Sequence, residues 1–502
     1  MESEARPPFS ARIKAFLFKN ESAKQTIAKN SFWLSVSNFG GRFIKAAIVI
    51  YGARVLGTEG WGVFSYAITL SGFLTLFMDP GLNGILMRDI AKSDDEDRHK
   101  LFSTTFAMKI VLMLVGVGVI IFIAPFFSTL PGAKALLPIV AIILALDTLR
   151  DFFTSVARGM EHMEYDAAIF ILTNIGILLF GFLFITLVKA PSSLAWAYVG
   201  GDILGISLAI IIIRTYFKDL SRHFTSSLVS PVLKAAWPFA VTSALGLLLT
   251  NADILILSWM RSASEVGIYS AAIRVVQVLY LVPTVIQFST LPLFSRLAGK
   301  DNERFRAALE RAVSIVFIGS LPLAIGGFIL GTPIMTFIFG GAYASGSLAF
   351  KILMLTMIVD FPATIVSNAI FAYNHQRSLI ITSAIAGALN VALDIILIPP
   401  FGMTGSAIGT LITQIVTNWY LWHIMKKLNY FEVAPHLKKI VFASAAMGLV
   451  TLGLYFAHLN VIATIVISVI VFFGALRLFR EPLLIEMKRL IFPTQDPAAP
   501  IV

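Results

Sequence analysis

The chain has 502 residues, of which 57% are apolar and only 13% are charged. Soluble domains carry about 25% charged residues, so this composition excludes an ordinary water-soluble protein and requires lipid around much of the chain. The absence of cysteine excludes disulfides, thiolate nucleophiles and cysteine-based metal sites. The net charge of +11 is spread over short loops between apolar segments, which indicates membrane topology, and no nucleic-acid partner is expected.

Fourteen apolar segments are predicted to span a membrane, because a spanning helix needs about 20 mostly apolar residues. They follow a basic segment, residues 1–26, that is expected to be cytoplasmic and shows no cleavable signal peptide. In chain order the fourteen segments cover residues 27–56, 61–90, 101–126, 133–159, 165–188, 193–217, 229–259, 264–297, 305–339, 346–373, 378–399, 403–427, 435–457 and 460–480. Several exceed 25 residues, so we expect those helices to tilt, kink or protrude.

The basic residues between these segments predict the orientation in the membrane. Loops on the side of the N-terminus, together with both tails, hold 29 Lys and Arg, whereas the opposite loops hold 5. Because basic loops tend to stay in the cytoplasm, both ends of the chain are predicted to lie there. The remaining basic residues fall inside predicted spans, and they are Arg42, Lys45, Lys109, Arg150 and Arg274.

An internal repeat indicates two related halves. Residues 59–67 (EGWGVFSYA) resemble residues 264–272 (SEVGIYSAA), and a weaker echo sets Glu161-His162 against Asn374-His375. Transporters are often built from such duplicated halves.

The predicted fold is therefore an all-α polytopic membrane protein of about 14 transmembrane helices in two six-helix bundles. The expected parts are an N-lobe with helices 1–6, a C-lobe with helices 7–12, an extra helix pair and a cytoplasmic tail, over residues 27–217, 218–427, 428–480 and 481–502.

Polar residues recur at helical spacing along one face of two predicted helices. On the first helix they are Ser31, Ser35, Asn38, Arg42 and Lys45, and on the eighth Ser270, Arg274, Gln277, Tyr280, Thr284 and Gln287. A central arginine costs about 2.5–3.5 kcal/mol even on insertion scales, so both stripes are expected to face a water-filled cavity. Arg42 and Arg274 fall near the bilayer midplane at about 1.5 Å per residue. The hypothesis is a cavity for an anionic solute, with Arg42, Lys45, Arg274, Asn38 and Gln277 as substrate-binding residues.

Seven aspartates also lie within predicted spans: Asp79, Asp147, Asp151, Asp202, Asp253, Asp360 and Asp394. Most are interpreted as partners of Arg or backbone groups that hold helices together. Asp202 and Asp360, near mid-depth, are the candidates for coupling transport to H+ or Na+, and no other cofactor is expected. Structural roles are predicted for Arg150, which adjoins Asp151, and for Lys109, which can extend from a helix end to water.

Several motifs carry a resemblance to a known family. They are Asn30–Leu34 (NSFWL), Arg54–Gly62 (RVLGTEGWG), Asp79–Leu82 (DPGL) and Arg88–Ala91 (RDIA). These stretches resemble the polysaccharide transporter (O-antigen flippase) family of the MOP superfamily, and the resemblance covers essentially the whole chain. It implies two bundles around a central V-shaped cavity that opens alternately to each side. It also implies an undecaprenyl-diphosphate-linked oligosaccharide as substrate, and an architectural role for the Asp79 motif.

The resemblance and the cationic stripes together favour a flippase that moves a lipid-linked oligosaccharide across the bacterial cytoplasmic (inner) membrane by alternating access. The expected partners are that substrate, membrane lipids, a polysaccharide polymerase and glycosyltransferases. A lipid II flippase fits almost as well. A MATE-type drug exporter fits less well, because it normally stops at twelve spans and favours acidic cavity residues.

An enzyme is not expected. A membrane glycosyltransferase or glycan ligase would need large outer loops with catalytic acids or arginine, and the outer loops here are short and nearly uncharged. The sequence also shows no catalytic triad, phosphate-binding loop or metal-ligand cluster.

Overall fold

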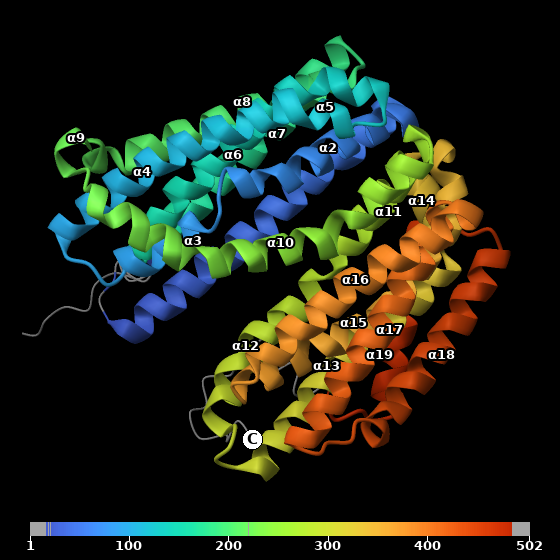
Figure 1. The fold of residues 1–502 in the computed structure, drawn as a ribbon. Helices are drawn as coiled ribbons and strands as arrows, with labels where there is room; N and C mark the ends of the chain where they lie inside the picture. The colour runs from blue at the N-terminus through green and yellow to red at the C-terminus, as the bar shows by residue number, and fades with distance from the viewer. Residues whose placement is uncertain (1–16, 19, 21, 219, 484–502) are drawn as a thin grey trace, which may run out of the picture. The chain divides into compact units, whose positions relative to one another are not determined.

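The computed structural model describes residues 17–18, 20, 22–218 and 220–483. These residues are almost entirely helical, and no strand occurs among them. Twelve of their segments are long and apolar enough to cross a membrane. The predicted class, an all-α polytopic membrane protein, is therefore confirmed (Figure 1). Most of the predicted cytoplasmic segments at the two ends of the chain lies outside the described residues.

The chain divides into two compact units, residues 1–248 and 249–502, and the division falls inside the long helix α10. Unit 1 contains α2 (Ala23–Leu74), α3 (Leu82–Ile90), α4 (Asp95–Gly118), α5 (Ala124–Phe127), α6 (Pro131–Gly159), α7 (Met163–Leu187), α8 (Pro191–Ile212), α9 (Leu220–His223) and the start of α10 (Val229–Met260).

Unit 2 contains the remainder of α10 and all later helices. These are α11 (Ala263–Leu279), α12 (Leu281–Leu297), α13 (Asn302–Ile329), α14 (Gly331–Phe339), α15 (Ser347–Ala372), α16 (Gln376–Phe401), α17 (Met403–Leu428), α18 (Ala434–Phe456) and α19 (Val461–Leu478). The last pair, predicted as an extra element, packs on α13 through a core that includes Ile440, Met447, Phe472 and Leu476.

The candidate spans follow the predicted segments closely. The first, Gln25–Phe77, covers the first predicted span and most of the second, and Gly57 interrupts its helical geometry with a φ of 70°. The twelfth predicted span corresponds to α17, which is long enough at 26 residues but less apolar than the twelve segments. The total of fourteen crossings stays a prediction.

The second predicted span is not one continuous helix. It breaks before α3, since Pro80 has no backbone N–H and Gly81 adopts a left-handed φ of 97°. Asp79 accepts a hydrogen bond from the Gly81 N–H (3.0 Å) and pairs with Lys109 (3.3 Å between Oδ2 and Nζ). This supports the architectural role expected for Asp79. The expectation that Lys109 extends to water is wrong, because its side chain is fully buried.

The eighth predicted span is also divided, at Tyr280 between α11 and α12. Pro283 follows three residues later and cannot donate the N–H that would continue the hydrogen-bond ladder through the junction. The Thr284 hydroxyl donates to the neighbouring Tyr280 carbonyl at 2.6 Å. The polar stripe on this span therefore crosses a helix break.

The weak sequence echo has a structural counterpart. Glu161 and Asn374, which lie two residues beyond the ends of α6 and α15, both adopt a φ of 60°. Each is followed by a histidine whose N–H returns to the helix: His162 to the Ala157 carbonyl (2.9 Å), and His375 to the Ile370 carbonyl (3.2 Å). Both helices thus end in the same left-handed capping geometry, as a duplicated structural unit would.

Candidate functional site

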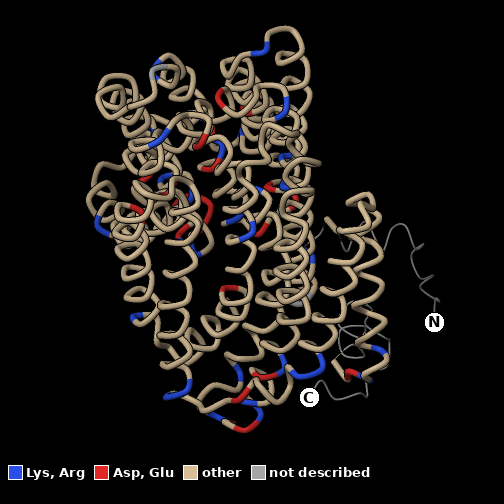
Figure 2. Tube along the Cα trace, turned by 90° about the vertical axis from the view of Figure 1, so that its right-hand side faces the viewer, with Lys and Arg blue, Asp and Glu red and all other residues tan. Residues whose placement is uncertain are grey.

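Charged residues lie along the helices as well as at their ends (Figure 2). In unit 1, α2 carries the predicted Arg42 and Lys45, and both side chains are exposed. The Lys45 Nζ lies 5.7 Å from the centroid of the Tyr198 ring, which is cation–π distance. The side chain of Asn38 lies outside the described residues. An exposed cation within an apolar span requires water or an anion beside it, so this face of α2 can bind an anionic group.

In unit 2 the predicted Arg274 lies on α11 and is half-buried. Its Nη1 donates to the Oε1 of Gln277 at 3.1 Å, so these two predicted residues meet as their one-turn spacing indicates. This contact orients a guanidinium, the side-chain group best suited to bidentate recognition of phosphate.

Asp202, a predicted coupling residue, lies in an ion-pair network in unit 1. Its Oδ1 is 2.9 Å from Nη1 of Arg150, and its side chain is only 2% exposed. Arg150 also pairs with Asp147 and, at 3.1 Å, with Asp151. The structural role predicted for Arg150 gains support, since three carboxylates from α6 and α8 converge on it. Ion coupling at Asp202 stays a prediction.

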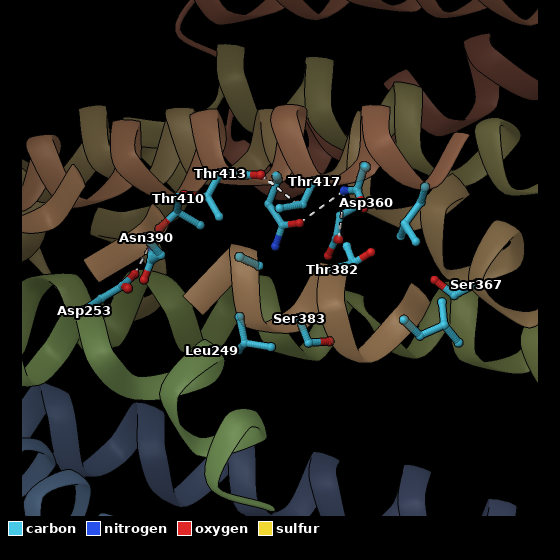
Figure 3. Close-up of a pocket in the computed structure, with 15 residues that line it drawn as sticks. Leu249, Asp253, Asp360, Ser367, Thr382, Ser383, Asn390, Thr410, Thr413 and Thr417 are labelled. Atoms are coloured by element: carbon cyan, nitrogen blue, oxygen red, sulfur yellow. Dashed lines mark hydrogen bonds between the residues drawn. The ribbon is translucent and has the colours of Figure 1, made fainter. Parts of the chain in front are cut away.

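Unit 2 contains a polar cavity of about 380 Å³ among α10, α15, α16 and α17 (Figure 3). Six hydroxyls, three amides and two carboxylates line it, and none of its fifteen described lining residues is basic. The polar ones are Asp253, Asp360, Ser367, Thr382, Ser383, Asn390, Thr410, Thr413, Gln414, Thr417 and Asn418. Polar groups around a space of this size in a membrane protein need water or an ion as partners.

Asp360, the second predicted coupling residue, lies at one end of this cavity (Figure 3). It accepts hydrogen bonds from the Tyr280 hydroxyl and, at 3.4 Å, from Nδ2 of Asn418. Tyr280 is the residue at the break between α11 and α12. Asp360 therefore contacts both the cavity and this helix junction.

Asp253, which lines the cavity far from Asp360, belongs to a pair of carboxylates. Asp253 of α10 is adjacent to Asp394 of α16, and its Oδ2 accepts hydrogen bonds from the hydroxyls of Tyr269 (2.6 Å) and Thr410 (3.0 Å). Asp394 is fully buried, and although the Ser406 hydroxyl lies near its carboxylate, neither of its oxygens accepts a hydrogen bond of regular geometry from the described residues. The Oδ1 of Asn390, one turn earlier, also lacks such a bond. Buried acceptors of this kind beside two carboxylates form a site that a proton or a cation would stabilise.

The sequence-based interpretation gave Asp253 and Asp394 only a structural role. A signal was present in the spacing of Asn390 and Asp394, four residues apart on one helical face. The side-chain atoms here that can coordinate a cation are all oxygens, which are the ligands that hard cations prefer. The described residues contain no cluster of three or more His, Cys, Asp or Glu suited to a metal ion. Amide and hydroxyl oxygens would therefore complete any coordination.

Comparison with known proteins shows which family the chain matches. The family model for "Polysaccharide biosynthesis protein" matches residues 27–298, which is more than half of the chain, and the MatE family model matches residues 238–396. The "Probable low-salt glycan biosynthesis flippase Agl15" of Haloferax volcanii is 22% identical over 90% of this chain and 94% of its own length. The capsular polysaccharide biosynthesis protein CapF of Staphylococcus aureus is 22% identical over 80% of this chain and 100% of its own.

Solved structures share the fold. The lipid II flippase MurJ in an inward closed conformation superposes with a TM-score of 0.73 at 19% identity, covering 90% of this chain and 99% of that one. An inward-facing MATE multidrug transporter of the MOP superfamily gives a TM-score of 0.60 at 14% identity, covering 78% and 95%. The family model matches more than half of the chain, so the chain belongs to the polysaccharide biosynthesis protein family, whose members are transporters and not enzymes.

Proposed function

We propose that the protein is a flippase that moves a polyprenyl-diphosphate-linked oligosaccharide across the cytoplasmic membrane by alternating access. The observation that carries this proposal is the presence of cations on the membrane-spanning helices of both units: Arg42 and Lys45 on α2, and Arg274 on α11. A relative named as a glycan biosynthesis flippase and one named for capsule biosynthesis support a glycan substrate. The proposed partners are the enzymes that assemble the glycan, such as glycosyltransferases and a polymerase.

In either unit these cations would bind a phosphate group of the diphosphate, whose charge is the feature shared by all polyprenyl-diphosphate-linked glycans. A hydrogen bond between charged groups is shorter and about twice as strong as a neutral one. The substrate's lipid chain would stay among the bilayer lipids while the polar headgroup crosses. Only binding that differs between the inward and outward states can drive such a change of access.

The proposed orientation has both chain ends in the cytoplasm. It is supported by the count of 29 basic residues in loops and tails on one side against 5 on the other. A glycan assembled in the cytoplasm would then enter from the basic side.

We further propose that Asp253 and Asp394 hold the coupling cation, which is Na+ or H+. Their burial, their adjacency and the unpartnered oxygens of Asp394 support this assignment over Asp202, whose charge is already paired with Arg150. When bound, a cation would neutralise part of the charge of the pair. Thr410 and Asn390 offer further oxygen atoms beside it.

Lipid II transport is the second candidate function, because the lipid II flippase shares the fold over nearly all of both chains. Complementation distinguishes the two. The gene is expressed in one strain that lacks its O-antigen or capsule flippase and in another depleted of its lipid II flippase. We expect surface polysaccharide to return in the first strain and no growth rescue in the second. The reverse result would transfer the assignment to lipid II, and rescue of neither strain by a well-expressed protein would contradict a flippase of either kind.

A further inference from the structure

Tyr280 connects the polar cavity of unit 2 to the helix that carries Arg274. It lies at the junction of α11 and α12, and its hydroxyl donates to Asp360 at one end of the cavity. Arg274 is on α11, less than two helical turns before Tyr280. A change at Asp360 can thus reach Arg274 through one side chain and a short length of helix.

Asp360 is a carboxylate held by neutral donors. Its described hydrogen-bond partners are the Tyr280 hydroxyl and the Asn418 amide, and no Lys, Arg or His among the described residues forms an ion pair with it. Removing a charge from water without a counter-charge is costly. A cation that reached Asp360 would supply the counter-charge that the surrounding side chains do not.

The cavity offers such a cation a route. Asp360 and Asp253 lie toward opposite ends of it, with Thr413 and Thr417 between them (Figure 3). The Thr413 hydroxyl is buried and unpartnered, as a group that contacts water or a passing ion would be. None of the described lining residues would repel a cation.

We propose that Tyr280 is a positioning residue whose hydroxyl competes for Asp360 with the coupling cation when that cation moves along the cavity from Asp253 and Asp394, so that a cation at Asp360 releases the junction between α11 and α12. This inference rests on the proposed cation coupling. We expect the cation to be sodium, since every side-chain atom around the cavity that can coordinate a cation is an oxygen.

The junction is built to respond to this release. Pro283 removes one backbone hydrogen bond there, and the Thr284 hydroxyl satisfies the Tyr280 carbonyl from within the same segment. The bond from Tyr280 to Asp360 ties the junction to α15. Once it is lost, α11 can change its angle to α12, and the direction of Arg274 changes with it. Such breaks are where helices absorb conformational change.

The first test measures binding of radioactive sodium to the purified full-length protein. Tyr280→Phe removes the competing hydroxyl and keeps the ring. We expect it to lower the half-saturating sodium concentration about ten- to a hundredfold, since this is the affinity equivalent of a hydrogen bond to a charged group. Asp360→Asn should raise that concentration. Tyr373→Phe is the matched control, because its hydroxyl bonds to Asn302 outside the cavity, and it should bind sodium as the wild type does.

The second test follows the junction itself. The chain has no cysteine, so V275C on α11 and F288C on α12 take spin labels without background. Sodium should shift the distance distribution between these labels. Adding Tyr280→Phe should produce the shifted distribution without sodium, whereas adding Tyr373→Phe should not.

Two results would overturn the inference. One is a Tyr280→Phe protein with wild-type sodium binding and wild-type label distances. The other is weaker sodium binding in Tyr280→Phe, which would make the hydroxyl a ligand of the ion and not its competitor. Neither test uses a glycan, so failure here is distinguishable from failure of the flippase assignment. Loss of binding in Asp394→Asn would separately confirm the carboxylate pair as a sodium site.

Discussion

Arg274 offers the sharpest test of the cationic substrate site. In the structure its Nη1 donates to the Oε1 of Gln277 at 3.1 Å. Arg274→Ala should therefore insert and fold, because removing a charge from a spanning helix lowers the cost of insertion. The substitution should instead weaken binding of the substrate.

The expected loss of transport follows from the strength of a hydrogen bond between the Arg274 guanidinium and a phosphate of the substrate. A hydrogen bond to a charged group contributes about 1.5–3 kcal/mol, and 1.4 kcal/mol is tenfold in affinity. Arg274→Ala should reduce flux at limiting substrate about ten- to a hundredfold. Arg274→Lys should recover only part of it, since lysine keeps the charge but not the planar fork. The assay is surface polysaccharide in a flippase-deficient strain, normalised to the amount of protein in the membrane.

Arg261 provides the matched control in the same unit. Its guanidinium donates to the backbone carbonyls of Ile398 (3.0 Å) and Pro399 (2.5 Å) and so holds the turn between α16 and α17. Arg261→Ala should lower the amount of folded protein and leave transport per molecule close to normal. Normal polysaccharide in both Arg274→Ala and Arg42→Ala would refute the cationic site. A loss of folded protein in Arg274→Ala like that in Arg261→Ala would assign Arg274 a structural role.

Three further predictions follow from the same contacts. Asp253→Asn and Asp394→Asn should each express normally but lose cation-dependent transport, measured with and without a sodium gradient at constant pH; full gradient dependence in both variants would remove the coupling site from this pair. Arg150→Met should destabilise the protein by about 3–5 kcal/mol, because it leaves Asp147, Asp151 and Asp202 without their shared cation. Thermal unfolding in detergent micelles should show a clear decrease that Arg304→Met does not, because the ion pair of Arg304 with Asp301 is exposed on both sides. Reporter fusions after Lys189 and Lys351 should report the outer side and fusions after Lys218 and Lys427 the cytoplasm, and a single reversal among them would contradict the proposed orientation.

Local and compositional properties could be predicted from the sequence. Low charge and long apolar segments determine a helical membrane protein, because only backbone groups bonded within the segment are tolerated in lipid. The contact between Arg274 and Gln277 also follows from spacing, since residues three apart are neighbours on any helix. The family could be recognised because its motifs are contiguous in the chain.

Contacts between distant segments could not be predicted in the same way. Periodicity indicates which face of a helix is polar but not which helix lies opposite, so Asp253 and Asp394 looked like separate buried acids until α10 and α16 were placed side by side. Asp202 looked available for coupling until the structure placed it against Arg150. The break at Tyr280 was hidden within one apolar run, because hydropathy responds to composition and not to a missing backbone hydrogen bond. Which carboxylates pair with a basic side chain, and which accept hydrogen bonds only from neutral donors, depends on tertiary packing alone.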